Sequence, residues 1–186
     1  RHAAESGSDP SEYVIKAEEN AAQAEKIDKG NLLAAGSRAF AYLMQAVFEH
    51  DSGSDIEKTI DTFNRAIESI LQRSPDLSIP YQHKAMGACI LGMHRAQKQH
   101  DPEPAFTQAL AAVAACQQRT QGIDANCASI AALVWANRAE RATAGERAVA
   151  VDRARASAGQ ALQSGANDSD VLLVTVGTMM VVDALE

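Results

Sequence analysis

The chain has 186 residues, which suits one domain or one uninterrupted repeat array and is enough to bury a core. Hydrophobic residues make up 46% of it and aromatic residues only 4%, and much of the apolar content is alanine, the best helix former. The net charge of −7 disfavours nucleic-acid binding, because an acidic chain repels the phosphate backbone. We therefore expect an all-α protein without a nucleic-acid partner.

Eight helices are predicted, in chain order, at roughly 10–27, 31–50, 55–73, 79–99, 102–119, 125–142, 146–163 and 169–186. Several of them start after an aspartate, whose side chain can cap the first backbone N–H groups. Asp9, Asp55 and Asp101 are each 46 residues apart, and Asp9 and Asp101 are each followed by a proline at the predicted first helical position. The even spacing indicates an internal repeat.

A stripe of small or apolar side chains recurs in every second helix, at a spacing of four and then three that keeps it on one face. The four copies are Ala17, Ala21 and Ala24, then Phe63, Ile67 and Ile70, then Ala109, Val113 and Cys116, then Ala154, Ala158 and Ala161. The intervening helices carry a small residue followed three positions later by a larger apolar one. These pairs are Ala41 and Met44, Gly87 and Ile90, Ala132 and Trp135, and Gly177 and Met180. A small residue lets the facing helix approach closely.

Each unit is thus predicted to be an antiparallel pair of helices, and stacked pairs bury what a single pair cannot. The whole chain, 1–186, is interpreted as one domain, with units at about 1–30, 31–75, 76–123, 124–168 and 169–186. The first and last units are partial, because the chain opens on a second helix and closes on a first helix. We expect an array cut within a repeat at both ends, as a piece of a longer array or protein.

The small residue on one helix and the alanine-rich stripe on the next resemble the tetratricopeptide repeat, where a proline often closes the unit, as Pro75 does here. The unit here is about 11 residues longer than the 34-residue tetratricopeptide unit, and the Trp, Leu-Gly and Tyr signature is mostly absent. With its Asp-Pro-Glu-Pro-Ala turn at 101–105, it looks like the extended arrays found C-terminal to bacterial serine/threonine protein kinase domains. The resemblance covers nearly the whole chain and implies a right-handed α-solenoid.

Motifs of catalysis and cofactor binding are absent from the sequence. It has no Gly-x-Ser-x-Gly elbow, no glycine-rich phosphate loop and no kinase catalytic loop, so we expect no catalytic residues, no cofactor and no enzyme activity in this chain. His83, Cys89, His94 and His100 are spaced by 6, 5 and 6 residues, which scatters them around a helix. No metal site is therefore expected.

The three cysteines, Cys89, Cys116 and Cys127, lie far apart in alanine-rich stretches and are interpreted as small buried apolar residues. This interpretation implies a reducing compartment and a cytoplasmic protein, and no signal peptide is visible at the start of the sequence. The most apolar stretch, 171–185, is shorter than the roughly 20 residues of a membrane helix and contains Asp183. No membrane association is expected.

The first helices of tetratricopeptide arrays line the concave, ligand-binding face, so the resemblance implies a partner surface here. Spacing from the small residues places on it Arg38, Tyr42, Gln45, Tyr81, Lys84, Asn126 and Ser129. Two cations, two tyrosines and an amide could hold a carboxylate or an acidic peptide. We expect a protein-binding or scaffolding module of a larger bacterial signalling protein, such as a serine/threonine kinase. The alternative is a ligand-binding domain of a transcription regulator, or an enzyme with a pocket between repeats.

The last predicted helix, 169–186, is apolar on nearly all sides. Such a helix must be buried on more than one side. We expect another chain to cover it, with a homo-oligomer formed through residues 170–186, or else an aggregation-prone patch.

Overall fold

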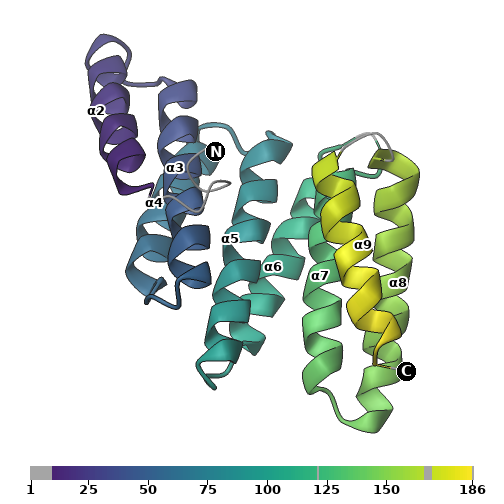
Figure 1. The fold of residues 1–186 in the computed structure, drawn as a ribbon. Helices are drawn as coiled ribbons and strands as arrows, with labels where there is room; N and C mark the ends of the chain where they lie inside the picture. Colours follow the sequence, from purple (N-terminus) through teal and green to yellow (C-terminus); the bar gives the residue numbers. More distant parts are fainter. Residues whose placement is uncertain (1–9, 121, 166–168, 186) are drawn as a thin grey trace.

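The computed structural model describes residues 10–120, 122–165 and 169–185, and this part of the chain contains eight α-helices and no strand (Figure 1). The helices are α2 (Ser11–Ile27), α3 (Leu32–Asp51), α4 (Glu57–Arg73), α5 (Ser78–Gln97), α6 (Glu103–Gln117), α7 (Ala125–Arg141), α8 (Ala144–Gly165) and α9 (Ser169–Asp183). The all-α prediction is confirmed, and each helix begins and ends within a few residues of its predicted bounds.

Asp55 and Asp101 lie at two helix starts but are not the predicted N-cap residues, because Ile56 and Pro102 occupy those positions. The Asp55 carboxylate accepts the backbone N–H of Glu57 at 3.0 Å, and the Asp101 carboxylate accepts that of Glu103 at the same distance. Each aspartate therefore stands two residues before the first helical residue and forms the local turn typical of Asp side chains. Asp9 lies outside the described residues.

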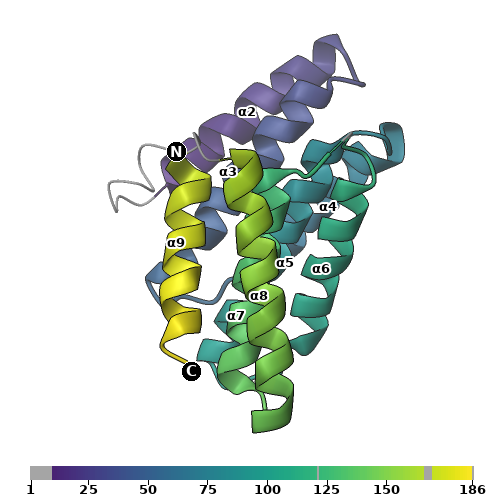
Figure 2. The ribbon, with the colours of Figure 1, turned by 90° about the vertical axis from the view of Figure 1, so that its right-hand side faces the viewer.

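The helices pack as stacked pairs. Helix α3 packs on α4, α5 on α6 and α7 on α8, and short connections make the two helices of each pair run in opposite directions (Figure 1). The first helix of each pair also packs on the first helix of the next, which gives a row of α3, α5, α7 and α9. Seen from the side, α9 lies at one edge, and α4 and α6 lie toward the other (Figure 2).

The predicted stripes form the interior of these pairs. All three members are buried in α4, α6 and α8, whereas in α2 only Ala21 is buried and its two neighbours in the stripe are half-buried. At the small-residue position, a Cβ on Gly87 would lie 2.4 Å from a ring carbon of Phe63, so the close approach predicted there is confirmed. Ala132 is also buried, but Ala41 is half-buried and Gly177 is exposed with open space around it.

The cysteines are buried as predicted, but two of them are not free. Cys116, in the last turn of α6, forms a disulfide bond with Cys127, in the first turn of α7. The two cysteines lie where α6 ends and α7 begins. Spacing along one helix does not predict contacts across that boundary, so the sequence interpretation missed the pair. Disulfides are rare in reducing compartments, and this bond therefore counts against the expectation of a reducing environment. Cys89 is the free cysteine.

No helix among the described residues has the length and apolar content needed to cross a bilayer. Helix α9, the most apolar one, has only 15 residues. Its Val171 and Val182 are buried, whereas Leu173 and Met180 are largely exposed.

Candidate functional site

The seven residues of the predicted partner face lie on α3, α5 and α7, and none of them is fully exposed. Arg38 forms ion pairs with two acids of α2, at 2.8 Å to Glu25 and 3.2 Å to Glu18. Lys84 forms an ion pair with Glu68 of α4. Both predicted cations thus turn toward the preceding helix, where their charge is already matched.

The other members of that face also have local partners. Tyr42 is half-buried, and this burial is the main reason that its pKa is raised. Gln45 donates a hydrogen bond to the Glu49 side chain at 2.9 Å, and the ring of Tyr81 lies 4.1 Å from the Arg119 guanidinium.

Ser129 is buried rather than exposed, and its hydroxyl donates to the backbone oxygen of Asn126 at 2.8 Å. Most of the seven residues are thus engaged by neighbouring side chains, and Tyr42 and Tyr81 pack against the same buried cluster. Their role in binding remains a prediction.

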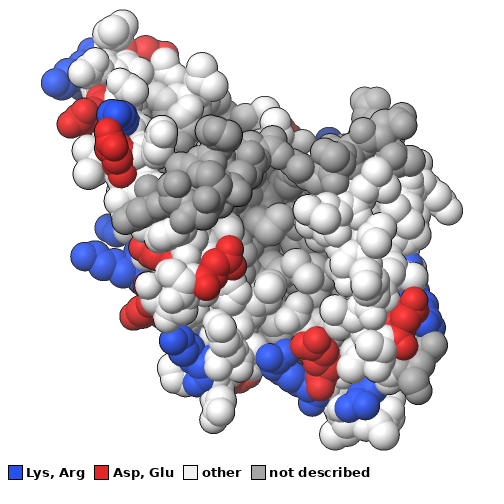
Figure 3. All heavy atoms as spheres, viewed as in Figure 1, with Lys and Arg blue, Asp and Glu red and all other residues white. Residues whose placement is uncertain are grey.

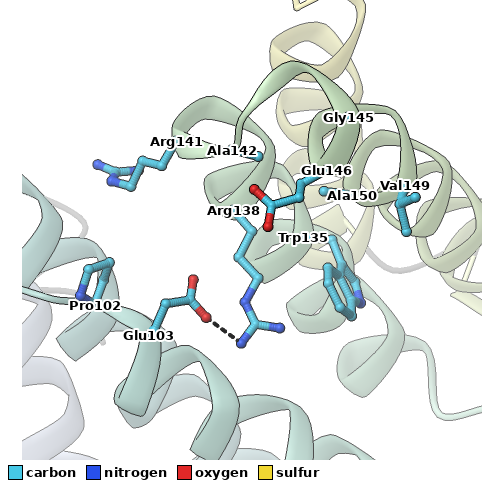
Figure 4. Close-up of a pocket in the computed structure, with 10 residues that line it drawn as sticks. All are labelled: Pro102, Glu103, Trp135, Arg138, Arg141, Ala142, Gly145, Glu146, Val149 and Ala150. Atoms are coloured by element: carbon cyan, nitrogen blue, oxygen red, sulfur yellow. Dashed lines mark ion pairs between the residues drawn. The ribbon is translucent and has the colours of Figure 1, made fainter.

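A hollow of about 650 Å³ lies where the start of α6, the end of α7 and the start of α8 meet (Figure 4). Its lining residues are Pro102, Glu103, Trp135, Arg138, Arg141, Ala142, Gly145, Glu146, Val149 and Ala150. The volume falls within the range of ligand pockets in proteins. The sequence analysis noted Trp135 as the large residue after Ala132, and Pro102 and Glu103 as part of a helix start, but it did not bring them together because the lining residues come from three separate helices.

One wall of this hollow is apolar and firmly held. The guanidinium carbons of Arg138 and Arg153 lie 4.9 and 4.5 Å from the centroid of the Trp135 ring, a cation–π arrangement that fixes the indole. Val149, on the first turns of α8, is 52% exposed although it is apolar. The wall can therefore accept an apolar group without any rearrangement of the indole.

Opposite charges alternate around the rest of the hollow. Arg138 forms an ion pair of 2.7 Å with Glu103, the dashed contact in Figure 4, and Glu146 accepts a hydrogen bond of 2.7 Å from the Thr143 hydroxyl. Arg141 stands at the end of α7. Two carboxylates and two guanidiniums leave the hollow with no net charge, so it can hold polar backbone groups better than a highly charged ligand.

The same mixing of charge extends over the surface. On the face shown in Figure 3, lysines and arginines lie among aspartates and glutamates, without a broad field of one sign. A basic stripe that would attract nucleic acid is not visible on that face.

One group of residues within the described ranges has the composition of a metal site. The ligand atoms of Cys116, Asp124 and Cys127 all lie within 4.8 Å of one another. In this structure, however, the two sulfurs are bonded to each other, and the Asp124 carboxylate accepts the backbone N–H of Cys127 at 2.8 Å. These contacts describe a covalent and hydrogen-bonded tie between α6 and α7.

The histidines considered in the sequence have other surroundings. His94 is buried beside His50, with ring centroids 5.9 Å apart, and His83 packs near Phe40. The Cys89 sulfur lies 4.0 Å from that of Met93.

Comparison with known proteins gives no further guide: no protein-family model, curated protein or solved structure matches this chain.

Proposed function

We propose that this chain is a protein-interaction module, built as a right-handed, tetratricopeptide-like α-solenoid of units of about 45 residues. Three features support the proposal: the stacking of helix pairs, the row formed by their first helices, and the buried stripes at equal spacing. Repeat arrays of this kind offer extended surfaces, and their units are regular because each one packs mainly on its neighbours.

The hollow between α6, α7 and α8 is the observation that carries the proposal. It combines an exposed apolar side chain, Val149, and a fixed indole, Trp135, with hydrogen-bonding groups at its edge. A peptide segment can place one apolar side chain against that wall while its backbone bonds to Glu146 or Arg141. This arrangement, an apolar anchor within a polar rim, is typical of protein interfaces.

Binding is favoured over catalysis by the residues that line this hollow. They include no cysteine, serine or histidine that could act as a nucleophile or base. The two carboxylates are already held, Glu103 by Arg138 and Glu146 by Thr143. A role within a larger bacterial signalling protein rests on the family resemblance. The cytoplasmic location was inferred from reading all three cysteines as free, and the disulfide argues against it.

The single tryptophan of the chain provides the test, because it lines the hollow. Peptides selected from a random phage-displayed library on the oxidised chain should share one apolar residue and change the Trp135 fluorescence. Val149→Arg should weaken their binding by about tenfold or more, because it fills the apolar wall with a charge. The control, Ile79→Arg, changes an exposed apolar residue on α5 and should leave the affinity unchanged.

The same peptides distinguish the two candidate surfaces. If the double substitution Arg38→Glu with Lys84→Glu abolishes peptide binding and Val149→Arg does not, the binding site is the predicted face of the first helices. A small molecule is the second candidate occupant, because the volume suits one. Small compounds that change the Trp135 fluorescence, together with a library that gives no binding peptide, would favour that alternative.

A further inference from the structure

Helix α9 presents an apolar stripe to solvent. Leu173 is 77% exposed, Met180 is 70% exposed, and Val176 lies between them with about half of its surface free. Residues 171–182 include no charged side chain, and the surface over α9 in Figure 3 is correspondingly uncharged along most of its length. A contiguous apolar patch of this kind marks an interaction surface.

The repeat identifies the counterpart of this stripe elsewhere in the chain. Counting 45 residues back from Leu173 and Met180 leads to Ala128, which is buried, and Trp135, which is half-buried, on α7. Ala128 clusters with Ala161 of α8 and Val171 of α9, and Trp135 packs against a second cluster that includes α8 and α9 residues. The exposed face of α9 is therefore the face that, on α7, packs on the two helices that follow.

The other end of the array has a matching site. Helices α2 and α3 border a hollow of about 480 Å³. The Ala17, Ala21 and Ala24 stripe lines it with Tyr13 and Leu33, and the polar side chains that also line it are Lys16, Asn20, Asn31 and Ser37. Both Tyr13 and Leu33 are more than half exposed.

Helices α2 and α3 pack on each other as α8 and α9 do. The Ala17–Ala24 stripe of α2 corresponds in the repeat to the Ala154–Ala161 stripe of α8, which is buried partly by α7. Among the described residues, no helix packs on α2 and α3 in the way that α7 packs on α8 and α9.

We propose that α9 of one copy of this chain packs between α2 and α3 of a second copy, with Leu173 and Met180 against the Ala17–Ala24 stripe. The contact continues the row of α3, α5, α7 and α9 into the next molecule. Because the contact joins two different surfaces, every assembly has an unoccupied α9 stripe at one end and an unoccupied α2–α3 hollow at the other. Such head-to-tail contacts form open chains rather than closed dimers.

Two blocked variants test the proposal. The double substitution Met180→Arg with Leu173→Glu blocks the α9 stripe. The double substitution Leu33→Arg with Tyr13→Glu blocks the hollow between α2 and α3. All four side chains are exposed, so the helix content measured by circular dichroism should not change. In sedimentation velocity, the unmodified chain should gain mass with concentration beyond a dimer. Each blocked variant alone should stay a monomer. An equal mixture of the two should form a dimer and nothing larger, because only one productive contact is left.

Other occupants would give different results. A contact between two α9 helices would leave the hollow-blocked variant dimeric, and an unmodified chain that stays monomeric at every concentration would exclude self-association. Either result overturns the proposal. Val149→Arg is the matched control, since it alters the α6–α8 hollow and should leave the assembly unchanged.

Discussion

Cys116 and Cys127 are joined by a disulfide bond that ties the last turn of α6 to the first turn of α7. The bond lies among buried side chains of α5, α6 and α7, so it joins two successive helix pairs at their shared core. Apart from the backbone itself, it is the only covalent link between units among the residues that the structure describes.

Removal of this disulfide should destabilise the array. Its two cysteines are 11 residues apart, and the entropy of a loop of about this size predicts a loss of roughly 2–3 kcal/mol in the free energy of unfolding. Urea denaturation with and without reductant measures the loss. In the control, Cys116→Ser with Cys127→Ser, reductant should have no effect. An unchanged midpoint for the unmodified chain would show that the bond adds no stability.

The remaining thiol, Cys89, should be unreactive in the folded chain. Its side chain is fully buried, and this burial raises its pKa to about 12, so the reactive thiolate is scarce at neutral or mildly alkaline pH. A maleimide or aromatic disulfide reagent should modify no thiol quickly in the oxidised native chain and one thiol per chain after denaturation. Rapid modification of the native chain would contradict the burial of Cys89.

Gly87→Ala should destabilise the fold by about 1–3 kcal/mol, because the new methyl group would collide with the fully buried Phe63 ring. Gly177→Ala is the matched control, since Gly177 occupies the same repeat position in α9 and has open space around it. That substitution should be neutral or stabilising by up to about 1 kcal/mol, from helix propensity. Equal effects of the two substitutions on thermal unfolding would argue against the close approach of α4 and α5.

Stability should decrease as the pH falls below about 6.5, the pKa of an unperturbed histidine. Burial, with the nearby His50 and Lys98, lowers the pKa of His94 in the folded chain. The unfolded chain therefore binds a proton at a higher pH than the folded chain, and stability declines from about pH 6.5 down through the folded pKa. His94→Gln should flatten this part of the pH profile of the melting temperature, whereas the same change at the exposed His100 should not.

Much of the architecture could be predicted from the sequence. The eight helices follow from alanine content and capping residues, and the stripe of Phe63, Ile67 and Ile70 follows from a spacing of four and three. These signals are local, because helical periodicity relates side chains within a few turns of one another. The repeat spacing of 45 to 46 residues also predicted which helices occupy equivalent positions in successive units.

The polar contacts could not be predicted in the same way. Arg38 and Lys84 were expected on an open face, but each forms an ion pair with an acid of the preceding helix. Spacing within a helix gives the direction of a side chain only relative to that helix. It does not give the angle at which the next helix crosses, and that angle decides which charges meet.

For this protein, the sequence by itself determined the helices, their order and the faces that they bury, because helix formation and apolar periodicity depend on near neighbours. Only the tertiary structure decided that Cys116 meets Cys127, and that Trp135, Glu103 and Val149 border one hollow. These contacts depend on the path of the turns and on the angles at which helix pairs cross. Neither can be predicted from the residue type at a single position.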